Sequence, residues 1–357
     1  MLKDITKILI VILTFSCKSE NIENDPILNQ DFSVQAESIQ QTEEDLGCSG
    51  LIPNAKPTGD FKTLIWSDEF DNDGQVCDKN WYAEIIPPNN GSWWNNELQY
   101  YTDDRKNLKV EDGLLKITAL RESYKGKEFT SARIVSKDLF DFMYGRVDVK
   151  AKLPRGGGTW PAIWMIGSNF DQVNWPRSGE IDIMEYDYFR KDKIHTTVHK
   201  ANENGDHVYF TSIKNDISNV SEEFHVYSLE WTSNELIFLI DNVIVYSFKN
   251  SPTYPFNQKF FLILNVAVGG NFVGNRVDTE FSEGVMEIDY VRVYEYQDSC
   301  ADIICDEDQI CEDGICIDIP LDPTVTFLVD MQNEFVDETG RTSQLLAERI
   351  IDAGRVN

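Results

Sequence analysis

The chain has 357 residues, of which 41% are hydrophobic and 12% aromatic, so it can bury a sizeable core. Its 32 Lys and Arg residues stand against 61 Asp and Glu residues, which gives a formal net charge of −29. A field of that sign argues against nucleic acid, which is bound through basic patches, and against sulfated or phosphorylated polymers. A neutral ligand remains compatible with this charge.

The first sixteen residues, 1–16, predict a secretory signal peptide. Two lysines precede an apolar run of eight residues, which is too short to span a bilayer. The run ends in LTFSC, which resembles a bacterial lipoprotein box, and this resemblance implies lipidation of Cys17. We expect an exported protein held by this lipid in a bacterial membrane, the outer one. The alternative is an ordinary cleaved signal with an incidental cysteine.

Residues 17–57 are polar and acidic and show no periodicity, which predicts a flexible linker that would tether the next domain to a membrane. From residue 58 to residue 297 the pattern changes to short strand-like runs separated by Gly, Asn and Asp. Asp241-Asn242 lies between two such runs and predicts a two-residue hairpin. Serial short strands over this length predict an all-β fold, a single antiparallel sandwich.

Residues 298–318 form an acidic, cysteine-rich segment, and residues 319–357 form a tail. The tail begins like a strand of a further, truncated β module, but residues 343–353 could instead form an amphipathic helix. Apart from Cys17, an even number of cysteines in an exported chain suggests disulfides, whose pairing the sequence leaves open. Zinc is the rival ligand for the last four, but their spacing does not match a C-x2-C knuckle. The six cysteines are Cys48, Cys77, Cys300, Cys305, Cys311 and Cys316.

The segment SGEIDIMEY at residues 178–186 carries the strongest chemical signal. On a strand, alternate side chains share a face, so Glu180 and Asp182 point one way and the isoleucines between them point into a core. Strict alternation would turn Glu185 inward, and a β-bulge that absorbs one residue would return it to the acidic face. The alternative is an amphipathic strand with a solvated acidic face. Tryptophans nearby, which are typical sugar-stacking residues, argue against it: Trp160, Trp164 and Trp175.

Two glutamates held close together on a rigid strand fit retaining glycoside hydrolysis, in which one is the nucleophile and the other the acid/base. The carboxyl group between them, Asp182, can hold a proton or a hydrogen bond that keeps one glutamate ionised and raises the pKa of the other. A zinc site at His195 and His199 is a weaker alternative, because their run is strand-like and lacks an adjacent Glu.

The EIDIME segment resembles the catalytic signature of glycoside hydrolase family 16, in its version with the extra Met. Further segments, spread over residues 61–296 in the family's order, resemble its laminarinase-like branch: WNNELQYYT at 94–102, GTWPAIWM at 158–165, LNVAVGGNF at 264–272 and IDYVRVY at 288–294. The family often has Pro where this chain has Val273. The resemblance implies a concanavalin-like β-jelly-roll sandwich with a concave substrate cleft.

The resemblance also implies roles for individual residues. It makes Glu180 the nucleophile, Asp182 the assisting carboxylate and Glu185 the acid/base. No cofactor is required for catalysis, but a structural calcium ion is expected on the convex side, held by the chain near Glu69, the carbonyl of Gly113 and the carboxylate of Asp289. The expected substrate contacts in the cleft are Asn96, Trp160, Trp164, Trp175, His199 and Asn265.

The resulting hypothesis is a monomeric endo-1,3-β-glucanase that acts on laminarin-type polysaccharide. Two alternatives stay open. One is an enzyme of the same family acting on mixed-linkage glucan or a galactan. The other is a non-catalytic β-glucan-binding protein, although such proteins typically lack the catalytic glutamates that are present here.

Overall fold

The computed structural model describes residues 60–89, 91–191 and 193–298, together with residue 305 and the short pieces 309–312, 315–318, 329–330 and 334–335. The predicted signal peptide, the linker up to residue 59 and most of the C-terminal tail lie outside the described residues. In the part of the chain that is described, no helix is long and apolar enough to cross a membrane.

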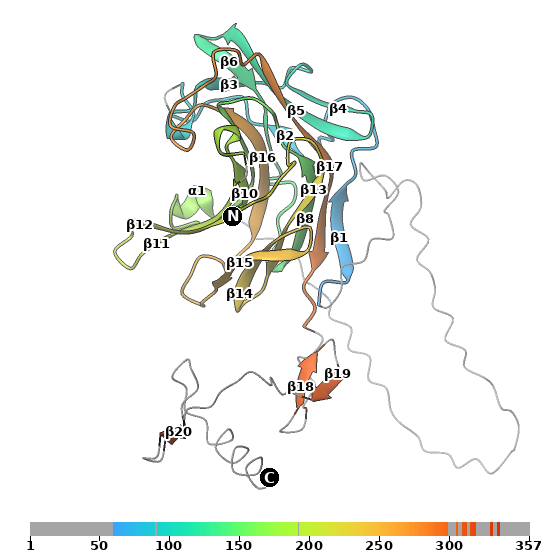
Figure 1. The fold of residues 1–357 in the computed structure, drawn as a ribbon, viewed down its shortest axis with the longest axis vertical. Helices are drawn as coiled ribbons and strands as arrows, with labels where there is room; N and C mark the ends of the chain where they lie inside the picture. Colours follow the sequence, from blue (N-terminus) through green and yellow to red (C-terminus); the bar gives the residue numbers. More distant parts are fainter. Residues whose placement is uncertain are drawn as a thin grey trace, which may run out of the picture. The chain divides into compact units, whose positions relative to one another are not determined.

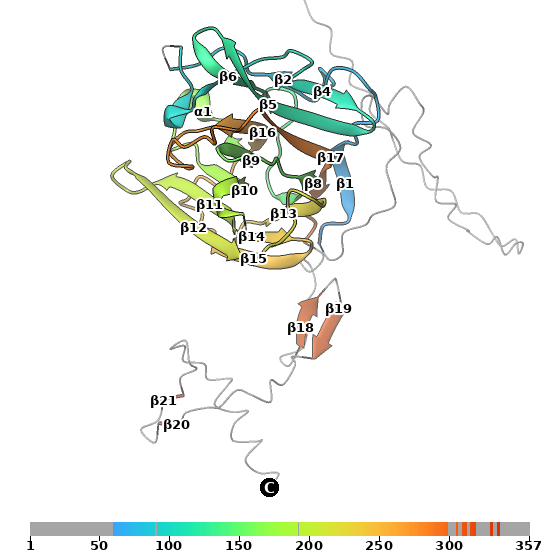
Figure 2. The ribbon, with the colours of Figure 1, turned by 45° about the horizontal axis from the view of Figure 1, so that its top comes forward.

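Residues 60–298 form two large β-sheets (Figures 1 and 2). The strands of the ten-stranded sheet are β1 (Thr63–Asp68), β3 (Gln99–Tyr101), β4 (Leu108–Glu111), β5 (Leu114–Tyr124), β6 (Lys127–Ser131), β8 (Gly145–Lys152), β13 (His225–Trp231), β14 (Glu235–Ile240), β15 (Val243–Lys249) and β17 (Glu283–Glu295). The main path of this sheet runs β15-β14-β13-β8-β17-β5-β6-β3, with β1 paired to β17 and β4 paired to β5.

The second sheet has seven strands in the order β12-β11-β10-β9-β16-β7-β2. They are β2 (Tyr82–Ala83), β7 (Arg133–Val135), β9 (Thr159–Gly167), β10 (Glu180–Tyr186), β11 (Lys193–Ala201), β12 (His207–Asn215) and β16 (Phe260–Val268). Figure 2 shows β9 to β12 side by side, with β12 at the edge. The described helices are short: α1 (Phe170–Val173) and the 3₁₀ turns Trp94–Asn96 and Tyr188–Arg190.

One apolar core lies between the two sheets. Ile117 of β5 and Val149 of β8, from the ten-stranded sheet, belong to the same buried cluster as Met165 of β9 and Ile181 of β10. Almost every strand pair is antiparallel, and Asp241 and Asn242 adopt φ values of 51° and 63° between β14 and β15. These are the left-handed conformations that a two-residue hairpin requires. The predicted all-β sandwich and this hairpin are therefore confirmed.

A buried ion pair joins the two ends of the sandwich. Arg292 of β17 donates from Nε and Nη2 to the two carboxylate oxygens of Glu69, at 3.0 and 2.8 Å. Both side chains are almost fully buried, and Glu69 directly follows β1, which itself pairs with β17. Because a buried charge is tolerated only when it is paired, this contact ties the first strand to the last one.

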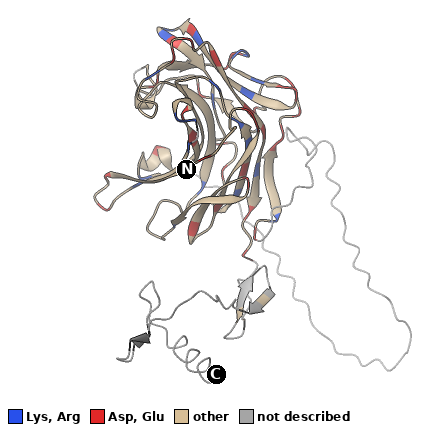
Figure 3. Ribbon diagram, viewed as in Figure 1, with Lys and Arg blue, Asp and Glu red and all other residues tan. Residues whose placement is uncertain are grey.

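Elsewhere on these strands, acidic and basic residues are interspersed along the ribbon (Figure 3). Many of them form ion pairs, such as Lys116 with Glu111 at 2.9 Å and Lys150 with Asp289 at 2.6 Å. The charge pattern of the sandwich is thus one of local pairing rather than of a block of one sign.

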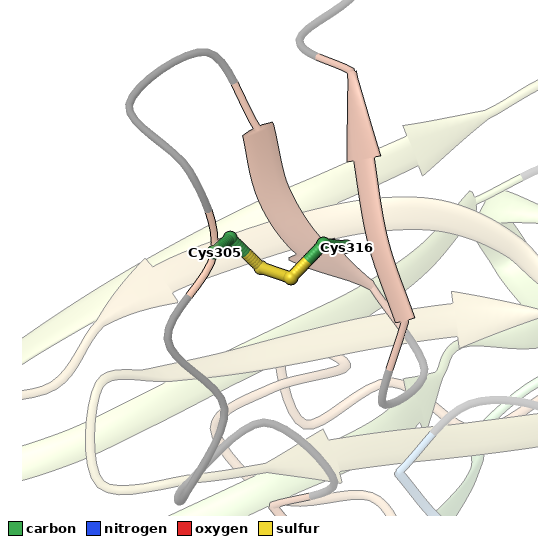
Figure 4. Close-up of a disulfide and its surroundings, with 2 residues drawn as sticks. All are labelled: Cys305 and Cys316. Carbon is green, nitrogen blue, oxygen red and sulfur yellow. A yellow bond between two sulfur atoms is a disulfide. The ribbon is translucent and has the colours of Figure 1, made fainter.

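The cysteine-rich segment contains the hairpin of β18 (Gln309–Glu312) and β19 (Ile315–Asp318), and two further short strands follow, β20 (Val329–Asp330) and β21 (Glu334–Phe335). A disulfide joins Cys305 to Cys316 with a Cα–Cα distance of 5.4 Å (Figure 4). Cys77 is disulfide-bonded as well. Disulfides rather than zinc are therefore confirmed for these three cysteines, whereas Cys48 and Cys300 lie outside the described residues. The tail helix expected at residues 343–353 also lies outside them.

Candidate active site

Strand β10 brings three carboxyl groups to one face of the seven-stranded sheet. Glu180 pairs with His199 of β11 and Asp182 with Thr197, after which the register shifts and Glu185 pairs with His195. The pairing with β9 shifts at the same place, so the strand contains the expected bulge. Both Ile183 and Met184 are buried in the core, and Glu185 returns to the side of Glu180. We call the face with these three carboxylates the acidic face.

Glu180 is held by an indole. Trp175, which is 41% exposed, donates from Nε1 to Glu180 Oε2 at 2.8 Å. Burial and the charge of Asp182 raise the pKa of Glu180 to about 8, against the lowering effect of His199 and of the Trp175 hydrogen bond. The oxygens of Glu180 and Asp182 and a nitrogen of His199 all lie within 4.8 Å of one another.

Asp182 is the most deeply buried of the three, at 3% exposure. Burial and the charge of Glu185 raise its pKa well above the usual range. His199 Nε2 lies 2.9 Å from Asp182 Oδ2, and its other ring nitrogen lies 2.8 Å from Nε2 of His207 on β12. Burial and the neighbouring His199 lower the pKa of His207.

Glu185 is held by a second indole. Trp160 of β9 donates from Nε1 to Glu185 Oε1 at 3.0 Å. Burial and the charge of Glu180 raise the pKa of Glu185 to about 7, against the lowering effect of His199 and of the Trp160 hydrogen bond. Next to it on β11, burial lowers the pKa of His195 to about 4, so that imidazole is neutral near pH 7.

Three carboxyl groups so close together cannot all be ionised at neutral pH, because each charge raises the pKa of its neighbours. Asp182 is the group that keeps its proton, since it is the least exposed. A protonated Asp182 removes the second of the two main causes that raise the pKa of Glu180, after burial, and can donate to its carboxylate. The geometry thus provides two glutamates whose pKa values lie near neutrality, about 8 for Glu180 and about 7 for Glu185, with a neutral Asp182 that favours ionisation of Glu180.

The loop after β16 positions Trp160. The ring of Trp160 stacks on Phe272 with centroids 5.0 Å apart. A Cβ atom at Gly270 would lie 3.1 Å from that same ring, and Gly270 has a φ of +83°. This position therefore favours glycine, which lets the backbone approach the indole closely.

Trp164 and Asn265 form part of a buried polar chain. Trp164 Nε1 donates to Asn265 Oδ1 at 2.7 Å, and Asn265 Nδ2 donates to Tyr101 Oη at 3.1 Å. Tyr101 Oη in turn donates to Glu97, whose pKa is raised by burial. Asn265 is 5% exposed, and both ends of its amide are used within the protein. Asn265 therefore holds Trp164, and its expected contact with substrate stays a prediction.

Asn96, another predicted contact, lies on the surface near the loop after β16. It has a φ of 58°, and its Nδ2 donates to Asn271 Oδ1 at 2.8 Å. The structure thus brings Trp160, Trp175 and His199 into direct contact with the three carboxyl groups. Trp164 lies opposite Asp182 in the pairing of β9 with β10, while Asn96 contacts Asn271.

Comparison with known proteins agrees with this geometry. The family model of glycosyl hydrolases family 16 matches residues 91–292. A beta-glucanase of Rhodothermus marinus is 39% identical over 266 residues, covering 70% of this chain and 91% of its own length. A glucan endo-1,3-beta-glucosidase of Cryptopygus antarcticus is 38% identical over 252 residues, covering 64% and 90%.

Among solved structures, one of LamA from Zobellia galactanivorans in complex with laminaritriose and laminaritetraose is 42% identical and has a TM-score of 0.62, covering 66% of this chain and 100% of that one. The chain belongs to glycoside hydrolase family 16. It is therefore a glycosidase with a jelly-roll catalytic domain, and family 16 glycosidases need no cofactor for catalysis.

The surroundings of the acidic face include groups that the sequence reasoning did not single out. Glu97 lies within the WNNELQYYT segment, which could have pointed to it. His207 and Tyr209 lie on β12, in a stretch that carries no motif, and only the register of β11 with β12 brings them to the acidic face. None of the segments compared with the family reaches them.

We predict distinct defects for the two catalytic glutamates. Glu180→Gln should lower kcat on laminarin by several orders of magnitude, since the amide cannot attack the anomeric carbon. Glu185→Gln should lower it by about 10²–10⁴-fold through loss of the proton donor. Asp182→Asn should cost less than either. Initial rates of reducing-sugar release measure all three, with thermal melting as the control for folding.

An aryl glucoside substrate with a good leaving group separates the two roles. Cleavage of its aryl bond needs no proton, so Glu185→Gln should still release the phenol, whereas Glu180→Gln should not. Wild-type-like activity in Glu180→Gln, or equal loss of phenol release in both variants, would contradict the assignment.

The pH profile offers a second prediction. The Trp160 N–H stabilises the ionised form of Glu185, so Trp160→Phe should raise the Glu185 pKa and keep the acid protonated to higher pH. The alkaline limb of kcat/KM, near pH 7 in the wild type, should move up by about one unit. Trp164→Phe is the matched control, because its N–H donates to Asn265 instead. A limb that stays in place or moves down in Trp160→Phe would refute the role of this hydrogen bond.

Proposed function

We propose that the protein is a retaining endo-hydrolase that cleaves internal 1,3-β-D-glucosidic bonds of laminarin-type glucans. The observation that carries the proposal is the bulged β10, which places Glu180 and Glu185 on one face with an indole N–H on each. The charge of Glu180 also acts on the pKa of Glu185, so the two groups are close enough to work on one bond.

The reaction proceeds as a double displacement. In the first half, the Glu180 carboxylate attacks the anomeric carbon, the glycosidic C–O bond breaks, and Glu185 gives its proton to the leaving oxygen. In the second half, Glu185 takes a proton from water, the water oxygen attacks the same carbon, and the bond to Glu180 breaks. One water is consumed, and two inversions retain the β configuration.

Asp182 and His199 tune this cycle without bonding to the sugar. A protonated Asp182 donates to Glu180 while that carboxylate is anionic, and His199, 2.9 Å from Asp182, supports the negative charge of the cluster. The Glu180 carboxylate is present before attack and forms again when its bond to the sugar breaks, and a neutral hydrogen-bond donor stabilises it in both steps.

Three tryptophans and Asn96 bind the glucan around the cleavage point. Trp160 and Trp175 each keep one edge on a catalytic carboxylate, which leaves the face of Trp160 opposite Phe272 and the exposed ring of Trp175 to stack on sugar rings. The net charge of −29 favours a neutral polymer, and the names of the relatives and the laminari-oligosaccharides bound to LamA support a 1,3-β-glucan over a galactan. A monomeric enzyme is sufficient for this chemistry.

We further propose that the domain is exported and tethered through a lipid on Cys17, with the acidic stretch of residues 17–57 as the linker. The support is the N-terminal sequence alone, since this part lies outside the described residues. Soluble polysaccharide would then be cut at the membrane that bears the enzyme.

Stereochemistry tests the mechanism directly. We predict that the first reducing-end product of laminarin hydrolysis is the β-anomer, because both displacements invert the anomeric carbon. Proton NMR in the first minutes of the reaction measures it, before mutarotation mixes the anomers. Early appearance of the α-anomer would overturn the retaining mechanism, and parallel digests of lichenan, agarose and carrageenan would show which polymer is cleaved fastest.

A structural calcium ion is a separate proposal. The Glu69 carboxylate is fully engaged by Arg292, so only the backbone near Glu69 can serve as a ligand, together with Gly113 O. The third ligand, Asp289, lies in the closing strand β17, where Lys150 contacts it at 2.6 Å. Calcium takes such oxygen ligands at about 2.3–2.6 Å and would have to displace this lysine.

We predict that a hundredfold excess of calcium over its Kd raises the melting midpoint by about 5–10 °C relative to chelator. Asp289→Ala should abolish the difference, and Glu280→Ala, an exposed acid elsewhere, should preserve it. Identical midpoints with chelator and with calcium in the wild type would dismiss the site.

A further inference from the structure

The edge strand β12 exposes aromatic rings on the acidic face, outside the group of residues described above as the catalytic site. Tyr209, the third residue of this strand, is 60% exposed. It pairs with His199, which pairs with Glu180, so the three side chains lie in one row across β12, β11 and β10. Two interstrand spacings separate the ends of this row, roughly 10 Å, the length of about two hexose units.

The rings in this region contact one another. Tyr209 lies 5.8 Å from His199 and 5.7 Å from His207, centroid to centroid, and the planes of Tyr209 and His207 differ by 24°. His207 lies 4.4 Å from the exposed ring of Trp175. Trp175, His207 and Tyr209 therefore form a continuous aromatic surface that starts at the nucleophile and ends at the sheet edge.

This surface has the chemistry of a sugar platform. Flat apolar rings cover the C–H faces of a pyranose, while the Tyr209 hydroxyl and the imidazole of His207 can meet its hydroxyl groups. The surface carries no carboxylate of its own, in contrast to the row of Glu180 and Asp182. The surface is continuous with the row of Glu180 and His199. Its expected ligand is therefore the same polymer, because a chain bound at Glu180 and directed across the strands must pass over it.

We propose that Tyr209, with His207 and the outer face of Trp175, forms a distal glucan-binding subsite. The subsite holds the substrate about two sugar units from the cleavage point and favours long chains over short ones. This inference rests on the proposed function, since it takes a β-glucan to be the polymer in the active site.

The opposite face of β12 supplies a matched control. Phe210 is 43% exposed and adjacent to Tyr209, but it pairs with Val198, a core residue, and packs on Phe248 at 5.2 Å. Its ring therefore points away from the acidic face. Tyr209→Phe is the conservative variant, because it keeps the ring and loses only the hydroxyl.

The test is binding of laminari-oligosaccharides of increasing length to the full chain made inactive by Glu180→Gln, measured by titration calorimetry. In this parent, affinity should rise when the oligosaccharide becomes long enough to reach β12. Adding Tyr209→Ala should reduce affinity about threefold to tenfold for the long oligosaccharides and leave the short ones unchanged. Tyr209→Phe should restore most of the gain, and Phe210→Ala should bind like the parent. Thermal melting of each variant shows that it is folded.

The outcomes separate the two proposals. Equal affinity of Tyr209→Ala and the parent at every length would overturn the subsite. A loss that is the same at all lengths would overturn it too, since Tyr209 would then act through His199 rather than on a distant sugar. Failure of the parent to bind any laminari-oligosaccharide, together with an active wild type on another polymer, would reject the proposed substrate and this subsite with it.

Discussion

Three carboxyl groups on one seven-residue strand repel one another, and the rest of the site is arranged around that repulsion. A regular strand would place Glu180 and Asp182 outside and turn Glu185 into the apolar core, where an unpaired acid is costly. The bulge between Asp182 and Glu185 resolves the conflict by sending both Ile183 and Met184 inward. The bulge lies in an interior strand, because β10 is paired with β9 on one side and with β11 on the other. Both pairings shift register at the bulge, so hydrogen bonds to both neighbours hold it in place.

An indole N–H, together with His199 rather than a lysine or arginine, compensates each of the two outer carboxylates. A lysine or arginine beside Glu185 would stabilise its anion strongly and hold its pKa well below the working pH, leaving no proton to donate. A neutral donor such as Trp160 stabilises the anion modestly, so the pKa of Glu185 stays at about 7 and the group can act in both directions. The same ring retains a free face, so one residue both tunes the acid and can stack on the substrate.

The sequence predicted the parts of the site that depend on local pattern. Alternation along β10, the extra Met that demands a bulge, and the Asp241-Asn242 hairpin are properties of a few consecutive residues, and the structure agrees with each. The hydrogen bonds of Asn265 to Trp164 and Tyr101 were not predicted, because these partners are about a hundred or more residues away and burial cannot be read from a motif. Tyr209 was missed for a related reason, since only the pairing of β11 with β12 reveals which face it occupies.

The exposed apolar side chains of β12 are unexpected at the edge of a sheet, and binding of substrate offers a reason for them. An edge strand that displays Tyr209, Phe210 and Ile213 offers both unpaired backbone groups and apolar side chains, which is a liability for aggregation. Lys214 and the turn residues at the ends of the strand lessen it, but a polar edge would avoid it altogether. A β-glucan lying over the acidic face would cover Tyr209 and leave Phe210 on the far side. Bound substrate would then offset the cost of exposing Tyr209. Because β12 lies two strands away from the bulged β10, substitutions on β12 can change the preference for chain length without disturbing the bulge.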